Sequence, residues 1–237
     1  MRYGAGAFAS LAAVAAIVCG CRPAPVVRSP MADAERQAQG EINDATRAVK
    51  RMWMEPGVAA LLRAAKGVLV VPAYGRGAYF LGGQGGRGVL VVRRSATEWS
   101  EPAFYSLGGA SFGLGAGGQG GPLALILMSD DAVGKFRDNG RTWQLAADTG
   151  LTIVGFAGTP SAASGNSKAD IVMWSGVRGL SAGISAAATY ITPSATLDDA
   201  YYHRLVTNRQ ILTGAVVSRY TAGLREALAG GSSASYR

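Results

Sequence analysis

Few residues in this chain have the types and spacing that catalysis requires. His203 is the single histidine among 237 residues, so a Ser-His-Asp triad would depend on it. The sequence has no G-x-S-x-G motif to supply the nucleophile. The pairs Asp130-Asp131 and Asp198-Asp199 stand where helices are expected to begin, so the helix dipole accounts for them without a metal or acid–base chemistry. We therefore predict a protein that is not an enzyme and has no cofactor or metal, with His203 at the surface or capping a helix.

Two glycine-rich stretches match the G-x-G-x-x-G pattern of dinucleotide-binding loops. They are Gly83–Gly88 and Gly115–Gly120. In a dinucleotide fold this pattern leads into a helix, whose N-terminus holds the pyrophosphate. Here the stretches lead into the apolar runs Val89–Val92 and Leu123–Leu127, which are typical of strands. We therefore do not expect nucleotide binding.

The excess of basic over acidic residues is confined to the first third of the chain. The formal net charge is +8, yet residues 95–237 carry ten Lys/Arg and ten Asp/Glu. Residues 22–94 carry 12 Lys/Arg against five Asp/Glu. Such asymmetry indicates an anionic partner, either a phospholipid surface or a nucleic acid, or else a surface whose arginines only maintain solubility. The four tryptophans are more typical of a core than of a base-stacking platform, and nucleic acid is not expected as a partner of an exported protein.

The N-terminus has the features of an export signal. Arg2 is followed by an uncharged, apolar stretch from Gly4 to Val18, too short to span a bilayer as a helix. The sequence Val18-Cys19-Gly20-Cys21 resembles a bacterial lipoprotein processing site, with Cys21 as the lipid-attachment residue. Cys19 is a rival acceptor, and a plain cleaved signal peptide is the alternative. We expect residues 1–20 to be removed and the protein to be exported and lipid-anchored, with the outer membrane favoured because Arg22 follows the acceptor.

The remaining chain divides by composition. Residues 21–30 contain three prolines and are predicted to form an extended tether of about 30 Å. Residues 31–229 are predicted to form a single domain, and residues 230–237 a flexible tail.

Periodicity predicts helices at both ends of the domain and strands between them. Residues 33–53 carry apolar side chains at helical spacing, with Asp33 as the expected N-cap, and a second short helix is expected from Pro56 to Ala65. Glycine clusters separate short apolar runs between residues 67 and 127, a short helix is expected at 130–138, and residues 197–229 return to helix. The fold class predicted is α+β, a bent, Gly-rich antiparallel sheet or partly open barrel flanked by N- and C-terminal helices. Further strands are expected within 143–156 and 171–191.

Several of these segments, taken in order, resemble the SYLF domain family of lipid-binding proteins. The matching segments are Ala65–Pro72, Gly82–Leu90, Trp99, Pro102–Gly113, Leu127–Ser129, Gly179–Ser185, Asp199–Tyr202 and Ile211–Leu212. The resemblance runs from about residue 33 to residue 228. It implies binding of membrane phospholipids through basic residues near the N-terminus, and it implies no catalysis. In a bacterium, anionic lipids such as phosphatidylglycerol or cardiolipin are the natural ligands.

Nine residues are candidates for phospholipid binding, since each Lys/Arg near an anionic membrane contributes about 1 kcal/mol and Trp53 suits the interface. They are Arg47, Lys50, Arg51, Trp53, Arg63, Lys66, Arg87, Arg93 and Arg94. The alternative for each arginine is a solvated face or an ion pair with a nearby acid. The alternative function is an envelope structural or adaptor lipoprotein that binds a protein partner through its Gly-rich sheet.

Overall fold

The protein is described by a computed structural model covering residues 29–78, 81–112, 117–145, 151–155, 169–176, 189–218, 220 and 222–230. The expected signal peptide, Cys21 and most of the tether lie outside these residues, as do residues 231–237 of the tail expected at 230–237.

The chain enters the domain through a long helix, α1 (Pro30–Trp53), followed by α2 (Pro56–Ala64). The prediction that Asp33 caps α1 is wrong: Ser29 Oγ accepts from Ala32 N at 3.2 Å, and Pro30 occupies the first turn. Proline is favoured there because its missing N–H would have no intrahelical partner. The predicted apolar stripe is confirmed, since Ala38, Ile42, Ala45 and Val49 are buried.

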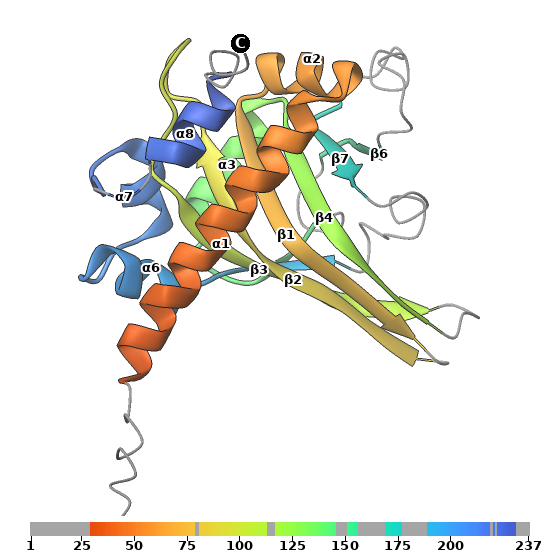
Figure 1. Cartoon of the computed structure of the whole chain (residues 1–237), viewed down its shortest axis with the longest axis horizontal. Coiled ribbons are helices and arrows are strands. Elements are labelled where there is room, and N and C mark those ends of the chain that lie inside the picture. The colour runs from red at the N-terminus through yellow and green to blue at the C-terminus, as the bar shows by residue number, and fades with distance from the viewer. Residues whose placement is uncertain are drawn as a thin grey trace, which may run out of the picture.

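An eight-stranded sheet forms the centre of the fold, in the order β5-β8-β3-β2-β1-β4-β7-β6. Its strands are β1 (Gly67–Ala78), β2 (Leu81–Val92), β3 (Ala103–Phe112), β4 (Gly117–Leu127), β5 (Trp143–Gln144), β6 (Ile153–Gly155), β7 (Ile171–Ser175) and β8 (Thr189–Pro193). All neighbours pair antiparallel except β6 and β7. The long strands β1–β4 curve strongly, so the α+β fold with a bent, partly open barrel is confirmed (Figure 1).

The glycine clusters lie within the strands and do not separate them. Gly83–Gly88 is part of β2, paired with β1 and β3 on either side, so it forms no loop before a helix. A Cβ at Gly88 would lie 2.7 Å from the carbonyl oxygen of Val70 on β1. The glycine therefore permits a close approach between the two backbones that no other residue allows.

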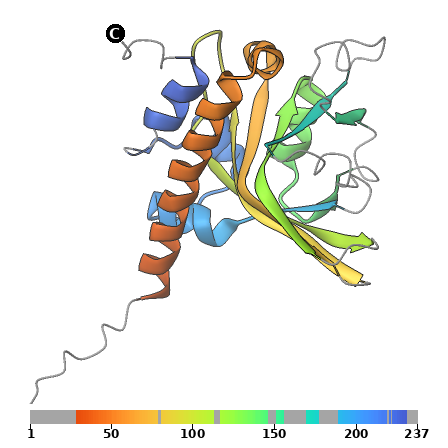
Figure 2. The ribbon, with the colours of Figure 1, turned by 45° about the vertical axis from the view of Figure 1, so that its right-hand side comes forward.

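Each face of the sheet has its own hydrophobic core. One core joins α1 and α2 with α6 (Ala195–Tyr202) and α8 (Ala222–Leu228), packed on residues such as Val70 and Val91. The other, on the concave face, joins α3 (Asp130–Asp138) and α7 (Asn208–Thr213) with residues such as Leu69 and Leu90. The two layers of helices on opposite sides of the sheet are visible in Figure 2.

The C-terminal helices confirm the helical prediction for 197–229. His203 is the left-handed C-cap of α6, with φ of 52°, and its Nε2 lies 3.2 Å from Glu35 Oε1 on α1, which confirms a surface and capping role. Trp99, Trp143 and Trp174 are buried, as expected for core residues. Within the described residues, no helix combines the length and apolar character needed to cross a bilayer.

Candidate functional site

The corner where α1 passes into α2 carries an exposed basic cluster, which we call the basic corner: Lys50, Arg51, Trp53, Met54 and Arg63. Lys50 and Arg51 are exposed on the last turn of α1, where positive charge also stabilises the helix dipole. Met54 is the C-cap of α1, and its side chain is 81% exposed. Met54 was not among the sequence candidates, because exposure of an apolar residue in a turn is not encoded in periodicity.

Trp53 joins the basic corner to α8 and contacts Arg63 on α2. Its Nε1 donates to the carbonyl oxygen of Ala227 at 2.7 Å, joining the end of α1 to α8. The guanidinium carbon of Arg63 lies 5.5 Å from the centroid of the Trp53 ring, a cation–π distance. Trp53 is therefore half-buried and contacts both Arg63 and α8, so it is not a free interfacial side chain.

The charges of Lys50 and Arg51 are not offset by a neighbouring acid. Neither forms an ion pair with any residue that the structure describes. The nearest carboxylate in sequence, Glu55, accepts from Trp174 Nε1 at 3.0 Å. By contrast, Arg47 is paired with Asp44 one turn earlier on α1. The end of α1 thus has a net positive charge that the rest of its exposed face lacks.

Two other predicted arginines pair with acids of their own surroundings. Arg87 Nε lies 3.3 Å from Glu41 Oε1, which joins β2 to α1, and Arg94 Nη1 lies 3.2 Å from Glu98 Oε1. Burial raises the pKa of Glu41 despite the nearby Arg87 guanidinium. These two arginines match the alternative of ion-paired surface residues and lie outside the basic corner.

Arg93 is committed to the structure of the domain. Its Nε donates to the carbonyl oxygen of Ala65 at 2.8 Å, and its Nη2 to that of Leu62 at 3.0 Å. These are carbonyls at the C-terminal end of α2, which have no intrahelical partner. The guanidinium also lies 4.3 Å from the centroid of the Trp99 ring, and burial lowers the pKa of Arg93. Arg93 therefore caps α2 and does not point to a ligand.

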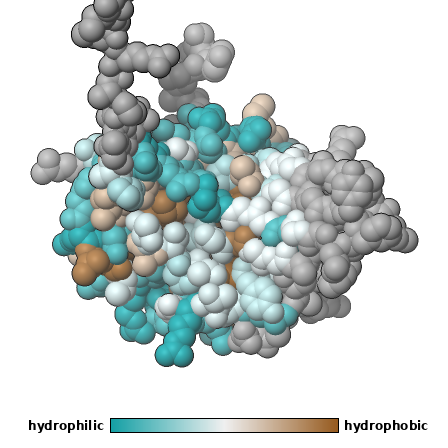
Figure 3. All heavy atoms as spheres, turned by 90° about the horizontal axis from the view of Figure 1, so that it is seen from below, coloured by the Kyte–Doolittle hydropathy of each residue, from teal (hydrophilic) through white to brown (hydrophobic). Residues whose placement is uncertain are grey.

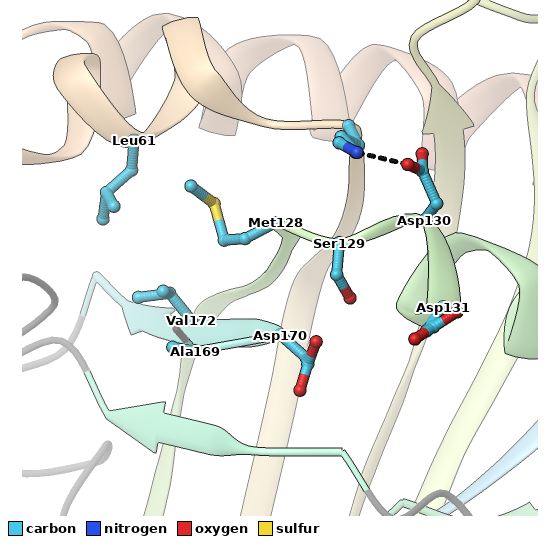
Figure 4. A pocket seen from close by; sticks show the side chains of 9 residues that line it. Leu61, Met128, Ser129, Asp130, Asp131, Ala169, Asp170 and Val172 are labelled. Atoms are coloured by element: carbon cyan, nitrogen blue, oxygen red, sulfur yellow. Dashed lines mark hydrogen bonds and ion pairs between the residues drawn. The ribbon is translucent and has the colours of Figure 1, made fainter. Parts of the chain in front are cut away.

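Lys66 lies apart from the basic corner, in an acidic pocket of about 560 Å³ beneath α2. Its Nζ pairs with Asp130, and Asp131 and Asp170 line the same pocket. Figure 4 shows these carboxylates on one side and the apolar side chains of Leu61, Met128 and Val172 on the other. Hydrogen bonds from the Ser129 hydroxyl and the Thr152 N–H lower the pKa of Asp170. Three carboxylates against one ammonium group do not suit an anionic headgroup.

Among the described residues, the carboxyl group with the most displaced pKa lies in the core. Asp198 is fully buried, and its Oδ1 accepts from Phe104 N at 3.0 Å while Oδ2 has no hydrogen-bond partner. Burial raises its pKa to about 8. The sequence prediction that the helix dipole explains this residue is thus incomplete. Among the described residues, no three His, Cys, Asp or Glu side chains are grouped as metal ligands.

Comparison with known proteins places the chain in a family. A family model described as "Las17-binding protein actin regulator" and named Ysc84 matches residues 108–230, just over half of the chain. Protein YSC84 of Saccharomyces cerevisiae is 28% identical over 159 residues, and LAS seventeen-binding protein 3 of the same yeast is 29% identical over 163 residues.

Each of these alignments covers 66% of this chain but 34% of the yeast protein, so the chain spans about a third of the length of these curated relatives. No solved structure matches significantly. The family match begins within β3 and runs to the end of α8, and because it covers more than half of the chain, the chain belongs to the Ysc84 family of SYLF-domain proteins.

Proposed function

We propose that this protein is a non-catalytic phospholipid-binding protein of the cell envelope that binds anionic lipid through the basic corner. The observation that carries the proposal is the grouping of Lys50 and Arg51, both without an acidic partner among the described residues, next to the exposed Met54. Interfacial binding requires cations that attract the lipid phosphates and, beside them, an apolar side chain that enters the boundary of the acyl chains.

Pre-organisation supports the same function. Arg63 is held over Trp53, and Trp53 is held by α8, so one of the three cations of the corner is pre-oriented. Binding through Arg63 therefore costs less side-chain entropy than binding through a freely rotating arginine. The nine sequence candidates thus reduce to Lys50, Arg51, Trp53 and Arg63, with Met54 added.

We further propose that the chain is exported and that Cys21 carries the lipid anchor. The support is the sequence Val18-Cys19-Gly20-Cys21 and the apolar segment before it. A diacylated cysteine would give stable attachment, because a single acyl chain binds membranes only marginally. Mass spectrometry of the membrane-extracted protein tests this: the N-terminal peptide is expected to begin at an acylated Cys21, and an unmodified Cys21 contradicts the anchor.

Co-sedimentation of the unacylated chain with vesicles tests lipid binding. We expect binding to vesicles containing phosphatidylglycerol, weakened by salt, and little binding to pure phosphatidylcholine. The double variant K50E/R51E is expected to bind at least about tenfold more weakly, because it removes two attractive charges and adds two repulsive ones.

The matched control is R141E/R204E, which makes the same change in net charge at two exposed arginines on other elements. Equal weakening by both variants would show that only net charge matters, and would contradict a site at the basic corner. Absence of wild-type binding would contradict the lipid-binding function.

A second candidate function is an adaptor that binds a protein partner through the Gly-rich sheet. The observation that favours it is the description of the matching family as Las17-binding proteins. Native mass spectrometry of the purified chain separates the two functions. Co-purifying phospholipid supports the first, and a lipid-free chain that does not bind vesicles supports the adaptor.

A further inference from the structure

We propose that the anchored protein bridges two membranes, with its lipid anchor in one and the basic corner on the other. The inference rests on the proposed function and concerns which membrane the corner meets. Its basis is that the anchor and the corner lie at opposite ends of a rigid element: the tether joins α1 at its first residue, and the corner is at its last turn. Figure 1 shows the first turn of α1 at the end of the helix that is remote from α2.

The lengths of the two segments restrict binding to the anchoring membrane. With 24 residues at about 1.5 Å each, α1 is about 36 Å long. Pro30 follows Cys21 by nine residue steps, which span at most about 30 Å when fully extended. The domain therefore cannot stand on its basic corner over its own anchor. The same membrane is reachable only in tilted orientations, whereas an outward-facing corner places no strain on the tether.

The exposed face of α1 does not favour a helix lying on the anchoring membrane. Along this face lie Asp33, Arg36, Asn43, Arg47 and Lys50, at spacings of three, seven, four and three residues. Arg36 is paired with Asp33, and Arg47 with Asp44, so most of the charge is neutralised. The apolar face that would enter an interface is already buried against the sheet, α6 and α8. This α1 is therefore a core helix and not an interfacial one.

The other end of α1 carries an apolar surface that suits the anchoring membrane. We call it the foot: Met31, Leu205 and Tyr220, all exposed. Tyr220 lines a shallow pocket with Ala32 at the start of α1, and the contact of His203 with Glu35 brings the connection containing Leu205 beside the same turns. Figure 3, seen from below, shows hydrophobic residues on the face that lies at the bottom of Figure 1, where α1 begins.

The ion pair of Asp33 with Arg36 limits the net charge around the foot. A domain resting on the foot directs the basic corner away from its own bilayer, toward a second anionic surface about 36 Å away. The fold thus separates an apolar contact near the anchor from a cationic contact at the far end.

Coupling through Cys21 allows a direct test. In the mature chain Cys21 is the one remaining cysteine, so it can be joined to a maleimide lipid in neutral phosphatidylcholine vesicles. Vesicles containing phosphatidylglycerol but no maleimide lipid are then added, and clustering is followed by dynamic light scattering. We expect clustering of the vesicles that salt reverses. K50E/R51E is expected to reduce this clustering at least about tenfold, whereas the charge-matched control R141E/R204E is expected to retain it.

Two failures are distinguishable. If the coupled protein causes no clustering while the free chain, with Cys21 blocked, still co-sediments with anionic vesicles, bridging is wrong and lipid binding stands. If the free chain does not bind anionic vesicles, the proposed function itself fails and bridging fails with it. Clustering that K50E/R51E and R141E/R204E reduce equally also overturns the inference, because it assigns the effect to net charge and not to the corner.

Discussion

Asp198 is a buried carboxyl group that couples the stability of the fold to pH. Its Oδ1 accepts from Phe104 N, which ties α6 to β3, while Oδ2 is buried without a partner. An ionised carboxylate in this position would be costly, so the proton is retained and the pKa rises to about 8. Because the protonated carboxyl group is uncharged, the hydrogen bond that joins α6 to β3 can be buried in the core.

We predict that Asp198→Asn removes a loss of stability at rising pH. Because the folded pKa lies above the unfolded value, the unfolded chain releases this proton first as pH rises from about 4 to about 8, and the free energy of unfolding falls by about 1.4 kcal/mol per pH unit from this group. The asparagine Oδ1 still accepts from Phe104 N, and nothing ionises.

Urea denaturation between pH 5 and pH 8.5 measures the effect. The difference in unfolding free energy between D198N and the wild type is expected to grow in favour of D198N as pH rises. D131N, which removes an exposed aspartate, serves as the control and is expected to follow the wild-type curve. Parallel curves for D198N and the wild type would contradict the buried, protonated carboxyl group.

The sequence identified the cationic residues but not their partners. The pairing of Arg47 with Asp44 is a local i, i+3 contact that the sequence could have indicated. The capping of α2 by Arg93 depends on β2 passing beside the end of that helix, a contact between elements that periodicity does not report. The exposure of Met54 depends likewise on the angle between α1 and α2. The sequence therefore did not predict the structural role of Arg93 or the exposure of Met54, because both depend on how the elements pack against one another.

At the level of elements, the glycines of β2 differ in what surrounds them. A Cβ at Gly88 would lie 2.7 Å from both the Val70 carbonyl oxygen and the Val71 side chain, whereas a Cβ at Gly83 would have nothing within 4 Å. We therefore predict that Gly88→Ala destabilises the protein by about 1–3 kcal/mol through overpacking. Gly83→Ala, in the same strand and the same motif, is expected to change stability by less than about 0.5 kcal/mol. Thermal unfolding of both variants measures the difference, and equal effects would refute a steric role for Gly88.

The sequence predicted element types better than element bounds in this glycine-rich sheet. Helices α1, α2, α3 and α6–α8 were anticipated because caps and apolar spacing are local properties. Glycine clusters predicted breaks between short apolar runs, although the single strand β3 continues from Ala103 to Phe112 through Gly108 and Gly109. Here glycine is selected for close backbone contact within strands. That reason becomes visible only when the neighbouring strand is known.

At the scale of the whole molecule, the first helix of the domain, α1, contacts the last described helix, α8. Helix α8 packs on α1, Trp53 donates to Ala227, and both helices belong to one core on the same face of the sheet. The basic corner is therefore supported by the last helix of the domain, over a separation of 174 residues. Lipid binding at the corner and attachment of α8 are thus expected to depend on one another.

This dependence leads to a prediction for Arg225 of α8. Arg225 Nη1 lies 3.0 Å from Oε1 of Glu101, a carboxylate that is 3% exposed. Arg225→Ala removes one partner of this buried carboxylate, and we expect a loss of about 1–3 kcal/mol in unfolding free energy. Arg225→Lys is expected to recover part of it, because the ammonium retains the charge but not the planar geometry.

Urea denaturation measures the stability, and vesicle co-sedimentation of the fraction still folded measures the consequence at the corner. Deletion of residues 231–237 is the control and is expected to change neither quantity. If R225A is destabilised and the folded fraction also loses affinity for anionic vesicles, then α8 positions Trp53 and Arg63 for the lipid. Unchanged affinity in the folded fraction would show that α1 and α2 hold the basic corner without α8.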